Sequence, residues 1–241
     1  MLTAEELSHI RDHYDTGLAY GDAGLGLLLG EIDLSRTVVM VVADHGEDLL
    51  DHGYMNHRAG LWDSTTHVPF VVAGPGFSAG QRRSELVDLR SVTPSLLAVA
   101  GAKPMAGVRA PAIQSLPPSN AVFAEGVMDE VSMRTPSLRL VVRNARLAAA
   151  DSLTTLGDGK FETADISMFR VDEKGMEGPD LFAGGAVDVP PTAEAAAMLA
   201  EIRKWRSGLD LATEPGTAIS DELRARLREQ GYWVPGDVPT Q

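Results

Sequence analysis

The feature that most constrains the fold is a continuous apolar run, TVVMVVAD at residues 37–44, which ends abruptly in polar residues. Its β-branched side chains do not alternate with polar ones, a pattern typical of a strand buried on both faces of a sheet. A second run, HVPFVVAGPG at residues 67–76, ends in a Gly-Pro-Gly turn, and SVTPSLLAVAG at residues 91–101 then predicts a helix. This order predicts an α/β sheet of parallel strands, with a ligand site beyond their carboxyl ends.

The segments on either side predict a long helix and a second domain. A capping-box pattern at residues 3–6 precedes apolar residues at helical spacing, so residues 4–30 are expected to form a long amphipathic helix. A connection rich in proline and alanine, residues 103–119, is expected to end a first domain, residues 1–119. The second domain is then residues 120–241.

The second domain has a different texture, with short strand candidates separated by turn residues, which predicts a small antiparallel sheet. A helix is expected at residues 192–209, and Ser220 is expected to cap a last helix that Gly231 stops. The strand candidates are, in chain order, AVFAEG, SMRTPSLRLVV, ARLAAA, KFETA and SMFRVD.

Composition excludes several classes of function. The formal net charge of -13, with scattered lysines and arginines, disfavours binding to nucleic acid. No run approaches the roughly 18 consecutive apolar residues that a membrane span needs, and the chain has no cysteine to act as a nucleophile. Because the protein is acidic, an anionic ester substrate would require a local positive site, most simply a bound cation.

Histidines gather in one segment. All six lie at or before position 67, and four of them lie in or at the exit of the loop between the two apolar runs, residues 44–66, which we call the histidine loop. Asp44 and His45 follow the first run directly and offer an oxygen and a nitrogen donor, while Gly46 would permit close backbone approach. These residues indicate a divalent-metal site. The residue types alone also allow Asp44 to cap the next turn, with His45 as an ordinary polar residue.

A family resemblance becomes visible in these motifs. Three consecutive segments are similar to the signature motifs of sulfatases in the alkaline phosphatase superfamily. They are YDTGLAYGDAGLGLLLGEIDLSRTVVMVVADHGEDLLDHG, NHRAGLWDSTTHVPFVVAGPG and VDLRSVTPSLLAVAG. The segments SMRTPSLRLVV, DISMFRVDEKGMEGPDLF and DELRARLREQGYW resemble its later motifs. The resemblance implies the C-terminal half of an alkaline-phosphatase-like α/β/α sandwich, followed by a small antiparallel subdomain with helices.

The resemblance also implies roles for individual residues. Asp44 and His45 match two ligands of a divalent metal, calcium first, with manganese or zinc as alternatives. His57 matches the position where the family places a lysine or histidine that contacts the ester oxygens and can protonate the leaving group. The alternative for His57 is an ordinary histidine of a surface loop.

Three further residues are weaker candidates for contacts to ligands or substrate. Glu47 belongs to the Asp-His-Gly-Glu string and is expected to orient a ligand or the turn. Arg58 could bind a sulfate with its planar guanidinium, or remain solvated. His67 opens the second apolar run, where a histidine satisfied at a strand edge is the alternative.

Two parts of the sulfatase site have no counterpart in the sequence. The Cys/Ser-x-Pro-Ser/Ala-Arg motif that yields the formylglycine nucleophile is absent, and so is the Asp-Asp pair of the first metal motif. We therefore expect a C-terminal fragment that is inactive and binds metal weakly alone, and whose missing partner is a separate N-terminal half. The expected substrate is a sulfate ester, small molecule or glycan. A phosphate or phosphonate monoester hydrolase and a non-catalytic pseudo-enzyme that serves as a binding partner remain alternatives.

Overall fold

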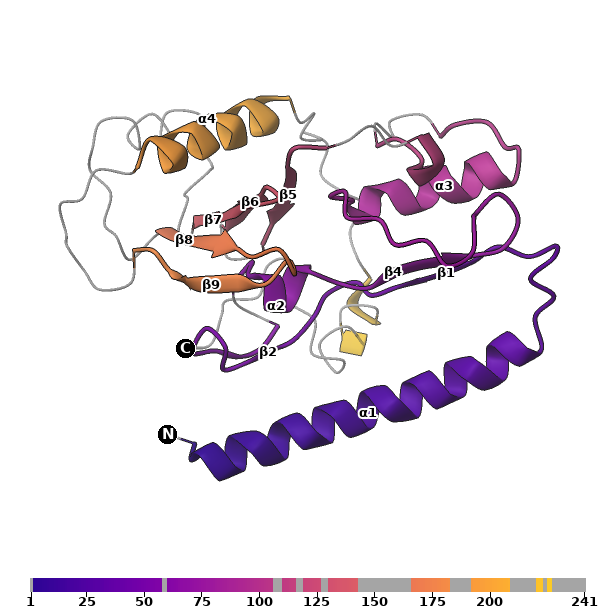
Figure 1. Ribbon diagram of the computed structural model, residues 1–241, viewed down its shortest axis with the longest axis horizontal. Helices are drawn as coiled ribbons and strands as arrows, with labels where there is room; N and C mark the ends of the chain where they lie inside the picture. The colour runs from indigo at the N-terminus through magenta and orange to yellow at the C-terminus, as the bar shows by residue number, and fades with distance from the viewer. Residues whose placement is uncertain are drawn as a thin grey trace. The chain divides into compact units, whose positions relative to one another are not determined.

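The computed structural model describes residues 2–57, 60–105, 110–115, 119–126, 130–142, 166–182, 192–208, 220–222 and 225–226. Contacts divide the chain into two units, Met1–Arg203 and Lys204–Gln241. The candidate residues described below all lie in the first unit, whose elements are labelled in Figure 1. The domain boundary expected at residue 119 stays a prediction, and most of the helix expected after Ser220 lies outside the described residues.

The first helix, α1 (Ala4–Gly30), begins where the sequence predicts. The Thr3 side chain accepts from the Glu6 backbone and the Glu6 side chain accepts from the Thr3 backbone, so the capping box is confirmed. No residue of α1 is buried, and its apolar side chains are largely exposed, including Leu18 and Tyr20. The helix therefore forms at the predicted place with its apolar residues uncovered by the described part of the chain.

The two apolar runs form strands β1 (Val39–Val42) and β4 (Phe70–Ala73), which pair with each other. Their pairing is antiparallel, with Val39 opposite Ala73 and Val42 opposite Phe70, so the parallel arrangement expected from the sequence is wrong for this pair. Neither strand is fully buried, since Val42 is 37% and Val71 57% exposed. The apolar pattern thus predicted the positions of the two strands, but it predicted neither their relative direction nor their exposure to solvent.

The predicted helix after β4 is also present. A 3-10 turn, η1 (Leu89–Ser91), is capped by the Asp88 side chain and leads directly into α3 (Val92–Val99). Gly101 follows the end of α3 at φ +63°, a backbone conformation that favours glycine, as expected for a residue that terminates a helix. A further 3-10 turn, η2 (Ile113–Ser115), lies in the expected connection.

The histidine loop contains three short elements. Strands β2 (Asp48–Leu49) and β3 (Met55–Asn56) pair as a small antiparallel ladder, and helix α2 (Asp63–Thr66) closes the loop. The shape of the loop depends on Gly60, which has φ +87° and at which an added Cβ would stand 1.7 Å from the Trp62 ring. A side chain at position 60 would displace that ring.

The predicted antiparallel sheet is confirmed. It has five described strands in the order β5-β6-β7-β8-β9. The segment SMRTPSLRLVV, expected as one strand, is a hairpin that turns at Thr135, and the ninth strand was not predicted. The candidates ARLAAA and KFETA lie outside the described residues. The strands are β5 (Val122–Glu125), β6 (Val131–Arg134), β7 (Leu138–Val142), β8 (Ile166–Val171) and β9 (Glu177–Asp180).

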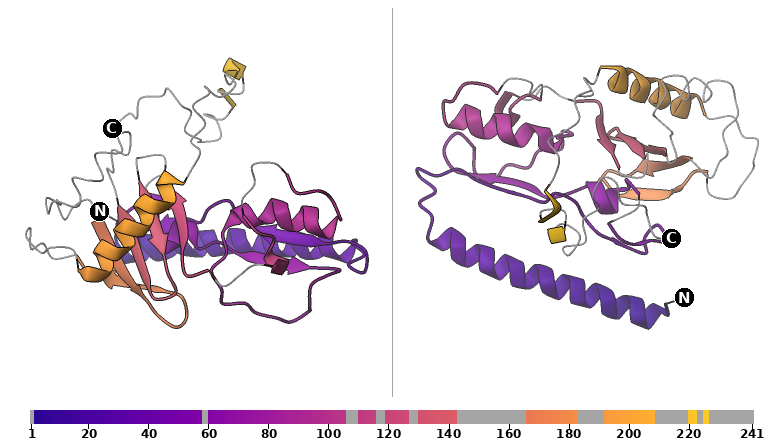
Figure 2. Two further views of the ribbon diagram at one scale, coloured as in Figure 1. Left: turned by 90° about the horizontal axis from the view of Figure 1, so that it is seen from above. Right: turned by 180° about the vertical axis from the view of Figure 1, so that it is seen from behind.

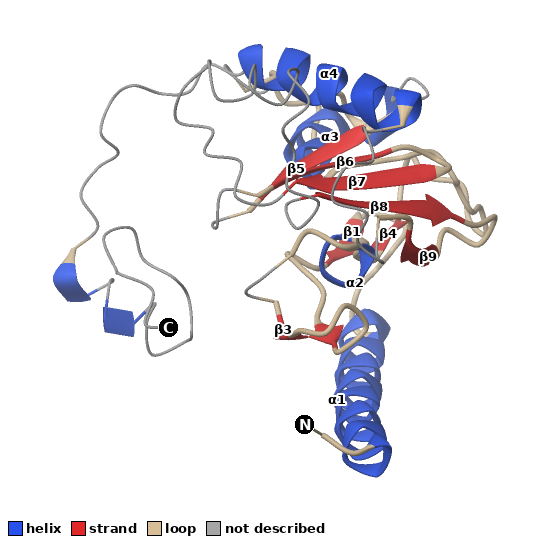
Figure 3. Cartoon of the chain, turned by 90° about the vertical axis from the view of Figure 1, so that its left-hand side faces the viewer, coloured by secondary structure: helices blue, strands red, loops and turns tan. Residues whose placement is uncertain are grey.

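The two faces of this sheet differ in chemistry. Register pairs Leu140 with Met168 on one face and Arg139 with Phe169 on the other, since paired residues share a face. Helix α4 (Ala193–Ser207) covers the apolar face, and α2 lies on the opposite side (Figures 2 and 3). The face toward α2 therefore carries arginine beside apolar residues, and it meets the histidine loop. No helix among the described residues is long and apolar enough to cross a membrane.

Candidate functional site

Asp44 and His45 stand just beyond the end of β1, as the sequence predicts. One Asp44 carboxylate oxygen, Oδ1, accepts the His45 backbone N–H at 3.0 Å, and the other lies 3.7 Å from His45 Nε2. His45 Nδ1 is 2.9 Å from the Gly46 carbonyl oxygen, so Nδ1 donates there and Nε2 keeps its lone pair when the ring is neutral. The Asp44 side chain is 73% exposed. Asp44 thus caps the turn and still presents one oxygen beside an imidazole nitrogen.

Gly46 packs against the far end of the histidine loop. Its N–H donates to the Thr65 carbonyl at 2.8 Å, and a Cβ at this position would lie 2.1 Å from the Ser64 carbonyl oxygen. The expectation that glycine permits close backbone approach here is therefore confirmed. This contact places the residues after β1 directly against α2.

His57 joins Asp44 and His45 from the middle of the loop. Its ring stacks on the His45 ring with centroids 4.0 Å apart and an interplanar angle of 21°. Its Nδ1 lies 3.0 Å from Glu47 Oε2, so the carboxylate accepts the Nδ1 hydrogen and Nε2 is left for another partner. The fold therefore brings four of the predicted site residues, Asp44, His45, Glu47 and His57, into one cluster.

The other two candidates are Arg58 and His67. Arg58 lies outside the described residues. His67 stands at the C-terminal end of α2, where its backbone N–H donates to the Asp63 carbonyl at 2.9 Å and its side chain is exposed. Within the described part of the chain, no hydrogen bond or ion pair joins His67 to Asp44 or His45, so its role stays a prediction.

The predicted metal ligands do not form a complete metal site. Among the described residues, no group of three or more histidine, aspartate or glutamate side chains is arranged to hold a metal ion. Asp44 and His45 offer one carboxylate oxygen and one imidazole nitrogen on the same side of the loop. Cations bound by such donors take at least four ligands in proteins. These two residues thus fit as part of a coordination shell that would need further donors.

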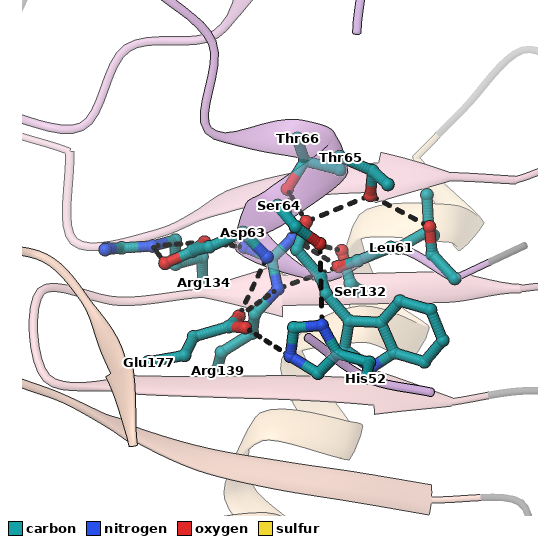
Figure 4. Close-up of polar contacts among 12 residues, drawn as sticks. His52, Leu61, Asp63, Ser64, Thr65, Thr66, Ser132, Arg134, Arg139 and Glu177 are labelled. Carbon is teal, nitrogen blue, oxygen red and sulfur yellow. Dashed lines mark hydrogen bonds and ion pairs between the residues drawn. The ribbon is translucent and has the colours of Figure 1, made fainter. Parts of the chain in front are cut away.

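A buried charge network, which sequence reasoning missed, ties the histidine loop to the antiparallel sheet (Figure 4). Asp63, the first residue of α2, accepts hydrogen bonds from the guanidinium groups of Arg134 and Arg139. Glu177 on β9 accepts the Asp63 backbone N–H at 3.0 Å and lies 3.1 Å from Arg139 Nε. All four side chains are at most 10% exposed. Their charges balance, which is how charged groups are accommodated in a protein interior.

Arg139 is the centre of this network. Besides Asp63, its guanidinium donates to the Leu61 carbonyl and the Thr66 hydroxyl, so it satisfies main-chain and side-chain acceptors of the loop at once. Burial lowers the pKa of the Arg139 guanidinium, and the neighbouring carboxylates of Asp63 and Glu177 oppose that shift. An arginine retains its charge under such conditions, so the group acts as a fixed cation beneath α2.

His52 adds a second layer to the network. Its Nδ1 lies 2.7 Å from Asp48 Oδ2 and its Nε2 lies 3.2 Å from Glu177 Oε2, while its ring stacks on Trp62 with centroids 4.6 Å apart. Ser64 also donates to Asp48 Oδ2 at 2.7 Å. These three residues are not a nucleophilic triad, because serine and aspartate both face Nδ1, whereas a triad needs the serine at Nε2.

A half-open groove of about 910 Å³ adjoins the network. It lies between the histidine loop and the β8–β9 hairpin, with Tyr54 and Asp51 on the loop side and Met176 and Asp180 on the sheet side. The side chains of Tyr54 and Met176 are 45% and 61% exposed. Residues of the charge network therefore line part of the groove, and the exposed side chains of Tyr54 and Met176 line the part that faces solvent.

Comparison with known proteins relates the loop and its strands to a known family. The family model described as "Sulfatase" matches residues 3–102. Arylsulfatase K of dog is 35% identical over 104 residues, covering 42% of this chain and 19% of the dog protein. Chicken arylsulfatase K is 30% identical over 140 residues, covering 56% of this chain and 24% of the relative. The chain therefore spans about a fifth of the length of the curated relatives it matches.

Solved structures extend the likeness beyond the family model. The structure of BT4656 in complex with its substrate, D-glucosamine-2-N,6-O-disulfate, has a TM-score of 0.55 at 17% identity and covers 80% of this chain and 39% of its own. A putative sulfatase from Bacteroides thetaiotaomicron has a TM-score of 0.50 at 18% identity, over 71% of this chain and 35% of its own. Both shares exceed what residues 3–102 alone could supply, so the likeness in fold extends beyond the residues that the family model matches. The fold is thus the alkaline-phosphatase-like α/β fold of sulfatases, in part, and residues 3–102 match the family model of sulfatases.

Proposed function

We propose that this chain is part of a sulfatase-type hydrolase that cleaves sulfate monoesters, and that Asp44, His45 and His57 are its contribution to the active site. One observation carries the proposal. The stacked rings of His45 and His57, beside the Asp44 carboxylate, bring a candidate leaving-group acid against a candidate metal ligand. The match of residues 3–102 to the family model and the arylsulfatase relatives support the same reaction class.

In the proposed reaction, His57 supplies a proton to the oxygen of the departing alcohol. The Glu47 carboxylate holds Nδ1 of His57, which leaves Nε2 as the atom that faces the ester. An imidazole suits this role because its ordinary pKa of about 6.5 allows both protonation states near neutral pH. Glu47 fixes the ring orientation, as a carboxylate commonly does for a histidine in an active site. The nucleophile, a formylglycine in the family, would come from outside this chain.

A divalent cation is part of the proposal, with calcium first and manganese or zinc as alternatives. Asp44 and His45 would hold it, and when bound it would neutralise charge on the sulfate oxygens. Two donors cannot satisfy a cation that takes four or more, so the chain alone should bind weakly.

We therefore expect calorimetric titration of the chain with calcium, manganese or zinc to give at best millimolar dissociation constants, in the weakest range known for calcium sites in proteins. The matched control is Asp51→Ala, which removes another loop carboxylate that lies outside the proposed site and pairs with Arg11. A submicromolar dissociation constant for one of these metals, lost in Asp44→Ala and kept in Asp51→Ala, would contradict the proposal that this chain supplies only part of the coordination shell.

The proposed partner is a separate N-terminal segment that carries the nucleophile and the first metal motif. The uncovered apolar residues of α1 and the incompletely buried strands β1 and β4 support a missing neighbour. The proposed substrate is a sulfated small molecule or glycan; a structural neighbour, BT4656, was solved with a sulfated sugar as its substrate.

Activity assays test the function directly. The chain alone is expected to show no turnover of an aryl sulfate, whereas co-expression with a segment bearing Asp-Asp and Cys-x-Pro-Ser-Arg motifs is expected to restore it. Parallel assays with phosphate and phosphonate monoesters test the second candidate function. That candidate is favoured by His45, since the resemblance places histidine there in the phosphonate-hydrolase branch. Absence of turnover in every combination would leave the third alternative, a non-catalytic pseudo-enzyme that serves as a binding partner.

A further inference from the structure

His52 faces a carboxylate at each of its two ring nitrogens. Nδ1 lies 2.7 Å from Asp48 Oδ2, and Nε2 lies 3.2 Å from Glu177 Oε2. Asp48 is fully buried and the Glu177 side chain is 5% exposed, so neither carboxylate can readily turn to water for a replacement partner. A neutral imidazole carries a single N–H and can donate to one of the two. The doubly protonated ring is therefore the state that can pair with both carboxylates.

The charges around His52 lead to the same state. The network joins three carboxylates, Asp48, Asp63 and Glu177, to two guanidinium groups, Arg134 and Arg139. Without a charge on His52 the group carries three negative and two positive charges in a poorly solvated interior. An imidazolium at position 52 makes the sum zero, which removes the cost of an uncompensated buried charge.

The aromatic neighbours also favour the cation. The indole of Trp62 lies parallel to the His52 ring, at an interplanar angle of 1° and a centroid distance of 4.6 Å. A cation within about 6 Å of a tryptophan face is attracted by the ring quadrupole. Phe169 on β8 approaches the edge of the same ring at 5.6 Å. Ser64, from α2, is a further polar neighbour and donates to Asp48.

We propose that His52 is a protonation-dependent latch that holds the histidine loop against strand β9 of the antiparallel sheet. Protonated, it bridges Asp48 at the start of the loop to Glu177 on the sheet. Deprotonated, it keeps one of these bonds and leaves the other carboxylate facing a lone pair. The latch is separate from the Asp44, His45 and His57 cluster, so it does not depend on the proposed reaction.

The expected pH dependence follows from the sign of the shift. Burial by itself lowers the pKa of His52, but hydrogen bonds and charges from Glu177 and Asp48 outweigh it and raise the pKa above its ordinary value of 6.5. A group whose pKa is raised by folding stabilises the folded chain fully below the unfolded pKa. That stabilisation is lost as pH rises from about 6.5 through the raised pKa. Asp51, Tyr54, His67 and Asp180 are the other titratable residues that line the adjoining groove in the described part of the chain.

The test is an NMR titration of the histidine rings in the full chain. The His52 ring is expected to be half-protonated at a pH above 6.5, and Glu177→Gln is expected to lower that midpoint, since the amide keeps the shape and removes the charge. The matched control is His67→Gln, which removes an exposed histidine near the same groove and should leave the His52 midpoint unchanged. Chemical unfolding of the unsubstituted chain should show stability falling as pH rises through the measured midpoint.

Two results would overturn the latch. One is a His52 midpoint at or below 6.5 in the unsubstituted chain, a measurement that needs no variant to fold. The other is a midpoint above 6.5 that Glu177→Gln does not lower, because the bridge to β9 would then not be the cause. Hydrogen exchange of the β2 amides adds an independent readout. Above the His52 midpoint, these amides are expected to exchange faster than the pH dependence of the intrinsic exchange rate predicts. Unchanged protection of the β2 amides would count against the latch.

Discussion

Replacing Arg139 by methionine is expected to destabilise the chain by about 3–5 kcal/mol, the cost typical of breaking a buried ion pair from one side. Methionine keeps much of the side-chain length but donates no hydrogen bonds. Asp63 and Glu177 would lose a cation, and the Leu61 carbonyl would lose its guanidinium donor. Urea unfolding followed by far-ultraviolet circular dichroism measures the change, and a stability of ordinary size could fall close to zero.

The control for this prediction is Arg83→Met. Arg83 also pairs with a carboxylate, Glu85, at 3.1 Å, but its side chain is 44% exposed and the pair faces solvent. Exposed ion pairs contribute at most about 1 kcal/mol, so this variant should unfold almost as the unsubstituted chain does. Equal effects of the two substitutions would show that the network around Arg139 does not hold the loop.

Much of the fold could be predicted because its signals are local. The helix at residues 4–30 follows from a capping box and a periodic pattern, and strands β1 and β4 follow from apolar runs. The direction of the pair could not be predicted in the same way. A continuous apolar run reports that a strand favours burial, and it carries no information about the direction of its neighbour. Strand β9, with the sequence EGPD, has no apolar pattern at all.

In the candidate site too, contacts between residues close in sequence could be predicted, and contacts between distant residues could not. Asp44, His45, Glu47 and His57 lie within 14 residues of sequence, and the structure brings them together as a cluster. The charge network could not be found in this way, because Arg139 lies 78 positions from Leu61, whose carbonyl it binds. A single arginine in each of two strands, Arg134 in β6 and Arg139 in β7, is by itself no sign of a buried site. The sulfatase-like segments NHRAGLWDSTTHVPFVVAGPG and SMRTPSLRLVV contain Asp63, Arg134 and Arg139, but the resemblance predicts no contact between them.

The two clusters share one loop but differ in exposure. The Asp44 and His57 side chains are 73% and 37% exposed, whereas the network beneath α2 is almost fully buried. Gly46 connects them, since its N–H donates to Thr65 of α2. The network therefore fixes the base of the loop, and the candidate catalytic groups remain open to a partner or a substrate.

The prediction with the largest expected effect on activity concerns His57 in the protein completed by a nucleophile-bearing segment. If His57 protonates the leaving oxygen, His57→Gln should slow hydrolysis of an alkyl sulfate by about 10²–10⁴-fold, the usual contribution of a general acid. An alkoxide is a strong base and leaves poorly without a proton. A nitrophenolate is stable as an anion, so the same variant should lose far less activity on a nitrophenyl sulfate. Steady-state kcat on the two esters measures the difference.

The contrast between the two esters separates two roles that a single assay would confuse. If His57 only binds the sulfate oxygens, its removal should lower the activity on both esters equally, because both contain the sulfate group. Equal losses would therefore contradict proton donation and leave His57 as a binding residue. In the unsubstituted chain, Glu47 Oε2 lies 3.0 Å from His57 Nδ1, and Glu47→Gln keeps an oxygen acceptor there. This variant should show the same dependence on the substrate, with a smaller loss of activity. Asp51→Ala, on the same loop but outside the cluster and paired with Arg11, should affect neither ester and thus controls for general damage to the loop.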